Sequence, residues 1–248
     1  MTGNERPGGR IATDTDQEAA RAAVVAAVAS RLEPGMLLGL GSGRAVWTLI
    51  DTLKARWAGR LPRVVVASSA TEARAAAAGF KILSLDGTVT LDVAVDGADQ
   101  LDRRLNLIKG HGAALLREKL VVAAADRFLV LAERAKLVDR LGEGMLLPVE
   151  VVRFAWAHTR RRLLEVVPKA TLRLGADRAP LVTDEHHYLL DCAVPARCDL
   201  SQLAERIKAT LGVVEHGLFL GMADQAFLGT PDGRIETLAS EPGEPRCG

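Results

Sequence analysis

The chain has 248 residues, and its 32 lysines and arginines nearly balance its 31 aspartates and glutamates, so no basic or acidic field marks a nucleic-acid or other highly charged partner. No stretch reaches the roughly 20 apolar residues of a membrane helix, and the first ten residues have no signal-peptide core. Three cysteines without Cys-x-x-Cys spacing indicate neither a disulfide framework nor a zinc site. These features predict a cytoplasmic protein that binds neither nucleic acid nor membranes.

Strands and helices alternate in the first half of the chain. A polar tail before residue 16 precedes a stretch with helical spacing of apolar residues, which Pro34-Gly35 ends. Continuous apolar runs predict strands at 36–40, 64–67, 81–85, 91–95 and 128–131, and helices are expected at 45–58, 71–78 and 115–125, with Gly79 as a cap. This alternation predicts a parallel sheet with helices on both faces.

The pattern changes after residue 142. Extended segments at 147–152, 171–174, 188–194 and 213–220, with helices at 155–166 and 200–211, predict a β-α-β-β-α-β module. Residues 222–228 and 234–238 are expected to return to the first sheet. The predicted fold class is therefore α/β, a Rossmann-like parallel sheet flanked by helices with a smaller inserted α+β (ferredoxin-like) module. The expected domains are 1–142 with 222–248, and 143–221.

Residues 91–120 gather the groups suited to chemistry. An apolar run delivers Asp96 and Asp99 at its carboxyl end, Lys109 precedes a glycine-bearing turn, and Glu118 follows on a helix. The carboxyl ends of parallel strands are where open α/β sheets bind small ligands. Three carboxylates beside one ammonium suit proton transfer better than anion capture. The alternative is that these residues form only turns and a solvated helix face.

A glycine loop precedes the second predicted helix. Gly39, Gly41 and Gly43 leave backbone amides open at a helix start, where the helix dipole favours phosphate or carboxylate. A dinucleotide fingerprint fails, because Arg44 and Val46 stand where the third glycine would be needed. No Gly-Lys-Ser/Thr follows, which excludes a Walker loop. The alternative is that the glycines only allow close strand-to-helix packing.

Metal and serine-hydrolase chemistry find no support in the sequence. Of the five histidines only His111 lies in the central stretch, and no His-x-x-x-His or other ligand spacing occurs. No Gly-x-Ser-x-Gly elbow is present. We expect no metal site.

These motifs together resemble the ribose-5-phosphate isomerase type A family. The resemblance runs from about residue 16 to 238. It rests on GLGSGRAV at 39–46, SSATE at 68–72, LDVAVDGAD at 91–99, IKGHGAALLREKLV at 108–121, AERAKLVDRLG at 132–142, LPVEVV at 147–152, VTDEHHYLLD at 182–191, GVVEHGLF at 212–219 and GTPDG at 229–233. Asp-Gly-Ala-Asp followed by Lys-Gly-x-Gly-Ala and Arg-Glu-Lys is its most specific part.

The resemblance implies an aldose-ketose isomerase that interconverts ribose 5-phosphate and ribulose 5-phosphate, a step of the pentose phosphate pathway, through an enediol and without cofactor. It places Glu118 as general base, Asp96 and Asp99 at the sugar hydroxyls, and Lys109 at the substrate oxygens. It implies a homodimer or homotetramer. The implied substrate-binding residues are Ser42, Gly43, Arg44, Ala45, Gly97, Ala98, Gly110, His111, Gly112 and Lys136.

Several positions depart from the family pattern. The family's phosphate loop reads Gly-Thr-Gly-Ser-Thr, and here Ser42, Arg44 and Ala45 replace its hydroxyl residues. His111 stands at a loop glycine, Gln100 at an acidic position, Ala135 at a serine, and residues 185–187 at an Asn-Gly-Asn turn. An isomerase for another sugar phosphate and a non-catalytic sugar-phosphate sensor remain alternatives. If the ligand is a phosphate, we expect Arg44 to bind it with the amides of Ser42 and Gly43.

Overall fold

A computed structural model describes residues 14–240 of the chain. Its first half contains α1 (Asp14–Ala29), β1 (Leu37–Leu40), α2 (Arg44–Arg56), β2 (Arg63–Val66), α3 (Ser69–Ala78), β3 (Lys81–Ile82), β4 (Val93–Gly97), β5 (Gln100–Leu101), β6 (Leu107–Ile108), α4 (Leu115–Ala123), β7 (Phe128–Glu133) and the 3₁₀ turn η1 (Arg134–Lys136). The second half contains β8 (Leu147–Val151), α5 (Trp156–Leu163), β9 (Ala170–Leu172), β10 (Tyr188–Cys192), α6 (Leu200–Lys208), β11 (Val213–His216), β12 (Leu218–Phe219), β13 (Gln225–Gly229) and β14 (Ile235–Ala239). The tail predicted before residue 16 lies outside the described residues, except for Asp14 and Thr15, which belong to α1.

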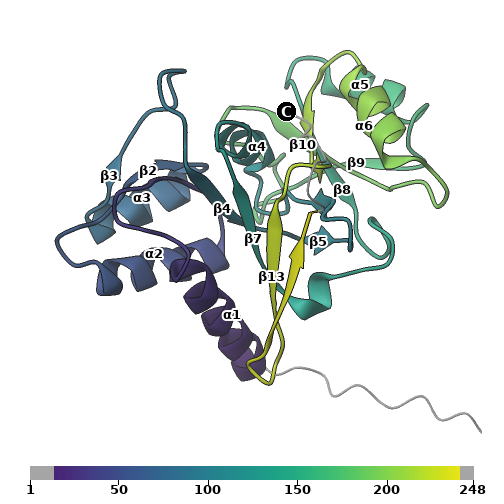
Figure 1. The fold of residues 1–248 in the computed structure, drawn as a ribbon. Helices are drawn as coiled ribbons and strands as arrows, with labels where there is room; N and C mark the ends of the chain where they lie inside the picture. Colours follow the sequence, from purple (N-terminus) through teal and green to yellow (C-terminus); the bar gives the residue numbers. More distant parts are fainter. Residues whose placement is uncertain (1–13, 241–248) are drawn as a thin grey trace, which may run out of the picture.

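The main sheet has seven strands in the order β14-β13-β7-β4-β1-β2-β3, and its strands are parallel except for β14. Apolar residues of α1 and α2 pack on one face and those of α4 on the other, which confirms the prediction of helices on both faces (Figure 1). Side chains alternate between the two faces along a strand. Val93 and Val95 therefore join the core under α1 and α2, whereas Ala94 and Asp96 face the side of α4.

The smaller module forms a four-stranded antiparallel sheet in the order β11-β8-β10-β9. With α5 and α6 it has the predicted chain order β-α-β-β-α-β. One core cluster joins the inner residues of its strands to Leu163 of α5 and to Leu203 and Ile207 of α6. The structure confirms the α/β fold class with its added module, and the placement of domain boundaries at 142 and 222 remains a proposal.

Two predicted strands are wrong in their extent, and the first of them, predicted over 81–85, ends at Ile82. The segment 213–220 is broken at Gly217 into β11, which belongs to the module, and β12, which pairs with β6 in a separate three-stranded sheet, β12-β6-β5. The amide of Gly217 donates to the Pro148 carbonyl, and the Gly217 carbonyl accepts from the Lys109 amide. The backbone at this point is therefore hydrogen-bonded to two different segments. The two-residue strands β5 and β6 were not expected, because so few residues carry no periodicity.

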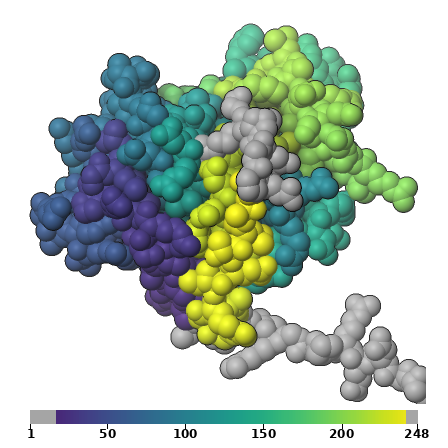
Figure 2. Space-filling view, in the orientation of Figure 1, coloured from purple at the N-terminus to yellow at the C-terminus, as the bar shows by residue number. Residues whose placement is uncertain are grey.

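The C-terminal hairpin β13–β14 returns to the main sheet, as predicted for 222–228 and 234–238. Figure 2 shows it, in yellow, directly against α1, in purple, so that segments from opposite ends of the chain lie side by side. This contact brings α1 over the carboxyl ends of β7 and β13. Within residues 14–240, every helix is too short or too polar to cross a membrane.

Candidate active site

The carboxyl ends of β1, β4 and β7 open onto a cavity of about 230 Å³. Parallel strands place their carboxyl ends on one edge, which is the usual ligand edge of such a sheet. The cavity is lined by Arg21, Val24, Ser42, Gly43, Arg44, Ala45, Gly97, Ala98, Asp99, Lys109, Gly110, Gly112, Glu118, Leu131, Ala132, Glu133 and Lys136. Charged side chains of both signs thus converge on one small space.

The ammonium of Lys109 lies at the buried end of this space. Its Nζ is 2.7 Å from Asp96 Oδ2 and 3.2 Å from Glu118 Oε2, and it donates to the Gly97 carbonyl at 2.8 Å. Lys109 is only 3% exposed and Glu118 only 5% exposed. The contact to the Gly97 carbonyl is a hydrogen bond, and the contacts to the two carboxylates are close ion pairs. Lys109 is therefore held in one position between two carboxylates.

Burial and the nearby carboxylate of Asp96 raise the pKa of Glu118 to about 8, although Lys109 opposes this shift. Burial acts to lower the pKa of Lys109, but the carboxylates of Asp96 and Glu118 raise it above its ordinary value. Glu118 belongs to the buried stripe of α4 that also contains Leu115, Val121 and Val122. A carboxylate in an apolar stripe, with a pKa near neutrality, has the properties of a general base.

The glycine loop packs directly against Asp96. A Cβ at Gly41 would lie 1.8 Å from the Asp96 carboxyl carbon, so only glycine fits there. Asp96 Oδ1 accepts hydrogen bonds from the amides of Ser42 at 3.1 Å and Gly97 at 2.7 Å. The Ser42 amide is therefore occupied, contrary to our expectation that it is available to a ligand. The remaining anion-binding donors of this loop are the unpaired amides in the first turn of α2.

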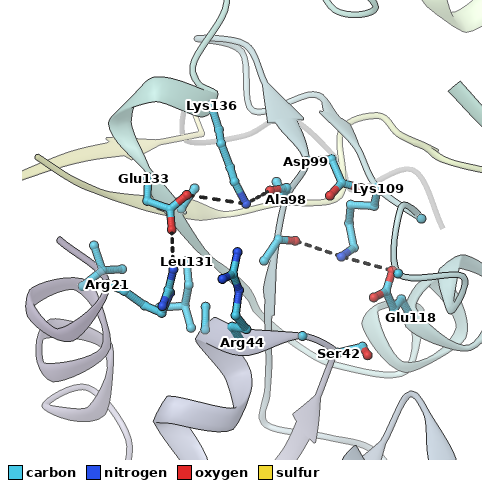
Figure 3. A pocket seen from close by; sticks show the side chains of 17 residues that line it. Arg21, Ser42, Arg44, Ala98, Asp99, Lys109, Glu118, Leu131, Glu133 and Lys136 are labelled. Carbon is cyan, nitrogen blue, oxygen red and sulfur yellow. Dashed lines mark hydrogen bonds and ion pairs between the residues drawn. The ribbon is translucent and has the colours of Figure 1, made fainter. Parts of the chain in front are cut away.

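Positive charge gathers at the other end of the cavity (Figure 3). Arg44 extends from the start of α2 into the space and has no ion pair within residues 14–240. Lys136 donates to the Ala98 carbonyl at 2.7 Å and lies 3.9 Å from Glu133, which also pairs with Arg21 at 3.2 Å. Three cations and one carboxylate make this end suitable for a dianion.

Most of the predicted site residues line the cavity, and two do not. Asp96 is buried behind Lys109, with 1% exposure. His111 donates its amide to Asp99 at 3.0 Å, while its ring lies 3.2 Å from the Leu146 carbonyl, in a separate hollow. Its side chain is outside the cavity because the backbone turns at Gly110, where φ is +107°.

Sequence analysis missed two charged cavity residues. Arg21 lies on α1, which the sequence predicted only as a helix, and Glu133 ends β7. The position of Glu133 at the carboxyl end of a parallel strand could have indicated it. No comparable local signal marks Arg21, because only the packing of α1 against β7 brings it to the site.

Comparison with known proteins agrees with this geometry. Residues 63–233 match the family of ribose 5-phosphate isomerase A (phosphoriboisomerase A). The chain is 47% identical over 211 residues to ribose-5-phosphate isomerase A of Roseiflexus sp. strain RS-1, covering 84% of this chain and 91% of the relative. It is 42% identical over 219 residues to that of Synechococcus sp. strain JA-3-3Ab, covering 87% and 95%. The chain belongs to the ribose-5-phosphate isomerase A family.

A solved structure supports the same assignment. It is a D-ribose-5-phosphate isomerase in complex with phospho-erythronic acid, 33% identical, with a TM-score of 0.84 over 90% of this chain and 98% of that one. The family's implied catalytic residues Asp99, Lys109 and Glu118 all reach the cavity here. Among the departures named above, Ser42, Arg44 and Ala45 line the cavity, whereas Gln100, His111 and Glu185 do not.

Proposed function

We propose that this protein interconverts D-ribose 5-phosphate and D-ribulose 5-phosphate through an enediol. The observation that carries the proposal is the pair of Glu118 and Lys109, 3.2 Å apart in a cavity whose far end is cationic. The end with Glu118 and Lys109 suits the carbonyl end of a sugar phosphate, and the cationic end suits its phosphate dianion. The family relatives carry the name of this activity.

In this proposal Glu118 removes the proton from C2 of the open-chain aldose and returns it to C1. Lys109 lies beside the carbonyl oxygen O1 and stabilises the negative charge that develops there. The hydroxyl proton of O2 passes to O1, which completes the conversion of the aldose into the ketose. Asp96 keeps Lys109 charged and in place, and Asp99, which faces the cavity, accepts hydrogen bonds from the sugar hydroxyls. A positioned general base contributes roughly 10²- to 10⁴-fold to such a step.

The phosphate lies at the end formed by Arg44, Lys136, Arg21 and the first-turn amides of α2. Figure 3 shows these cations separated from Glu118 by the width of the cavity. Gly97, Ala98, Gly110 and Gly112 form walls without bulky side chains. An extended sugar phosphate in this orientation has its reactive carbons beside Glu118.

The same proposal includes a homodimer or homotetramer in the cytoplasm. Support for assembly comes from Phe154, 90% exposed, and Leu211, 73% exposed. They lie on two paired segments, joined by the hydrogen bond from the Val152 amide to the Gly212 carbonyl, and grouped apolar side chains at a surface favour contact with another protein. Support for a reducing compartment comes from Cys192 and Cys198, which are free among the described residues. Light scattering after gel filtration measures the assembly, and a monomer would contradict that part.

The activity is tested with purified protein on ribose 5-phosphate, alongside other pentose and hexose phosphates. Glu118→Gln keeps size and polarity but removes the base, so turnover should fall at least about 100-fold with an unchanged melting temperature. Higher activity on another sugar phosphate would mean that ribose 5-phosphate is not the preferred substrate. If turnover by Glu118→Gln lies within a few-fold of the parent value, Glu118 is not the general base.

A further inference from the structure

The residue that follows Glu118 makes an unusual set of contacts. Successive helical residues point about 100° apart, so Lys119 turns away from the cavity toward the strands β11 and β12. Its side chain is 15% exposed. Its Nζ donates to the Glu215 carboxylate at 2.8 Å, to the His216 carbonyl at 2.7 Å and to the Leu218 carbonyl at 2.9 Å. All three donors of the ammonium are used.

The two carbonyls flank Gly217, and Gly217 is the point at which the backbone of Lys109 is held. The Lys109 amide donates to the Gly217 carbonyl at 2.9 Å. A Cβ on residue 217 would lie 2.1 Å from the Lys109 carbonyl oxygen, so only glycine allows the two backbones to lie this close together. Lys119 therefore fixes the strand segment against which Lys109 is aligned.

These contacts close a ring of interactions around the proposed reaction centre. Glu118 and Lys119 are neighbours on α4, Lys119 binds residues 216 and 218, Gly217 between them binds Lys109, and the Lys109 ammonium returns to Glu118 at 3.2 Å. The Phe219 ring lies inside this ring of contacts, 4.8 Å from Lys119 Nζ and 5.5 Å from Lys109 Nζ. Without the Lys119 contacts, the Gly217 backbone that aligns Lys109 is no longer tied to the helix that carries Glu118.

We propose that Lys119 is a positioning residue that sets the distance between Glu118 and Lys109 by anchoring the Gly217 backbone to α4. This inference rests on the proposed function for its kinetic consequence, but the distance itself exists in the free protein. Misplacement of a reacting group by 1 Å can reduce turnover about 100-fold. A substitution at Lys119 should therefore affect kcat more than KM.

Lys208 provides a control, because its Nζ binds the same Glu215 at 2.7 Å and the Val214 carbonyl at 2.5 Å but does not reach residues 216 and 218. We expect Lys119→Met to lower kcat at least about 10-fold with KM within about three-fold, and Lys208→Met to leave both near the parent values. Of the groups acting on Glu118, Lys109 lowers its pKa while Asp96 and Asp99 raise it. Displacement of Lys109 should therefore move the acidic limb of kcat/KM to higher pH in Lys119→Met alone.

Lys119→Arg covers the case in which Lys119→Met does not fold. A guanidinium keeps the charge beside Glu215, but its planar nitrogens cannot meet three acceptors arranged around one atom. We expect a folded Lys119→Arg protein with kcat reduced several-fold and the same direction of change in the pH profile. Either variant folded, with kcat and pH limb unchanged, overturns the proposal.

A direct measurement separates this inference from the proposed function. Carbon-13 NMR of glutamate carboxyls, with Glu118→Gln for assignment, follows the Glu118 titration in the free protein. The positioning role is supported if the Glu118 pKa is higher in Lys119→Met than in the parent and unchanged in Lys208→Met. This result holds even if ribose 5-phosphate is not the substrate. An unchanged Glu118 pKa in a folded Lys119→Met protein refutes it, whatever the parent enzyme isomerises.

Discussion

Replacing Arg44 with alanine tests how this protein holds the phosphate. Arg44 enters the cavity from the first residue of α2, and within residues 14–240 it has no carboxylate partner. Glu133 lies 3.2 Å from Arg21 and 3.9 Å from Lys136, so one carboxylate offsets part of the charge of both. Arg44 is therefore the cation with most charge available to a ligand.

The expected loss follows from that geometry. A charge-assisted contact to a dianion contributes about 1.5–3 kcal/mol, which corresponds to about 10- to 100-fold in affinity. Because Arg44 is an exposed residue, solvent screening favours the lower half of this range. We expect Arg44→Ala to raise KM for ribose 5-phosphate and the inhibition constant of inorganic phosphate together.

The assay compares Michaelis kinetics on ribose 5-phosphate with those on unphosphorylated ribose. If Arg44 binds phosphate, the substitution raises KM for ribose 5-phosphate and leaves kcat/KM for unphosphorylated ribose unchanged. Arg56→Ala, at the last turn of the same helix, controls for the loss of one positive charge. Values for Arg44→Ala within about two-fold of the parent for both KM and phosphate inhibition would refute the reasoning.

Three further predictions concern the reaction centre and its border. Burial and Asp96 raise the pKa of Glu118 to about 8, and Glu118 must be deprotonated to act as the base. We therefore expect kcat/KM to rise as the pH increases toward 8 and then to become constant. A flat profile from about pH 6 to 9 would contradict this. Activity should survive EDTA, because the Lys109 ammonium lies where a divalent ion would bind Asp96 and Glu118; loss restored by added metal would contradict this. His111→Gly should leave kcat and KM within about two-fold, because the His111 ring points away from the cavity; a larger change would place that ring at the substrate.

Local sequence was sufficient for the parts of the site that lie on continuous segments. Asp99, Lys109 and Glu118 come from one stretch of about 30 residues, and strand, loop and helix there follow from apolar runs and glycines. The predicted cap of α3, Gly79, likewise adopts the left-handed conformation, although the helix begins at Ser69, two residues before its predicted start. Such features depend on neighbours in the chain, which the sequence displays directly.

Features that depend on packing between distant segments were not predictable in this way. Arg21 reaches the cavity only because α1 packs against β7 and β13. Asp96 faces Lys109 instead of the cavity because Gly41 allows the glycine loop to pack directly against the Asp96 carboxyl group. The break at Gly217 arises from a carbonyl that serves Lys109, more than 100 residues away in the sequence. None of these contacts corresponds to a periodic pattern or a compositional bias in the amino-acid sequence.

The departures from the family pattern divide by their position relative to the cavity. Gln100 bonds to the Gly142 amide and the Glu143 carbonyl, and Glu185 pairs with Arg117, so both stabilise contacts between segments outside the site. Arg44 and Ala45, in contrast, line the proposed phosphate end of the cavity, where the family pattern described above has two hydroxyl residues. Hydroxyls bind an anion through neutral hydrogen bonds, whereas a guanidinium adds a full positive charge to its directed hydrogen bonds. Salt screens the part of this interaction that depends on charge. The chemistry at Glu118 and Lys109 is therefore expected to match that of the relatives, and the difference should lie in how strongly phosphate recognition depends on ionic strength.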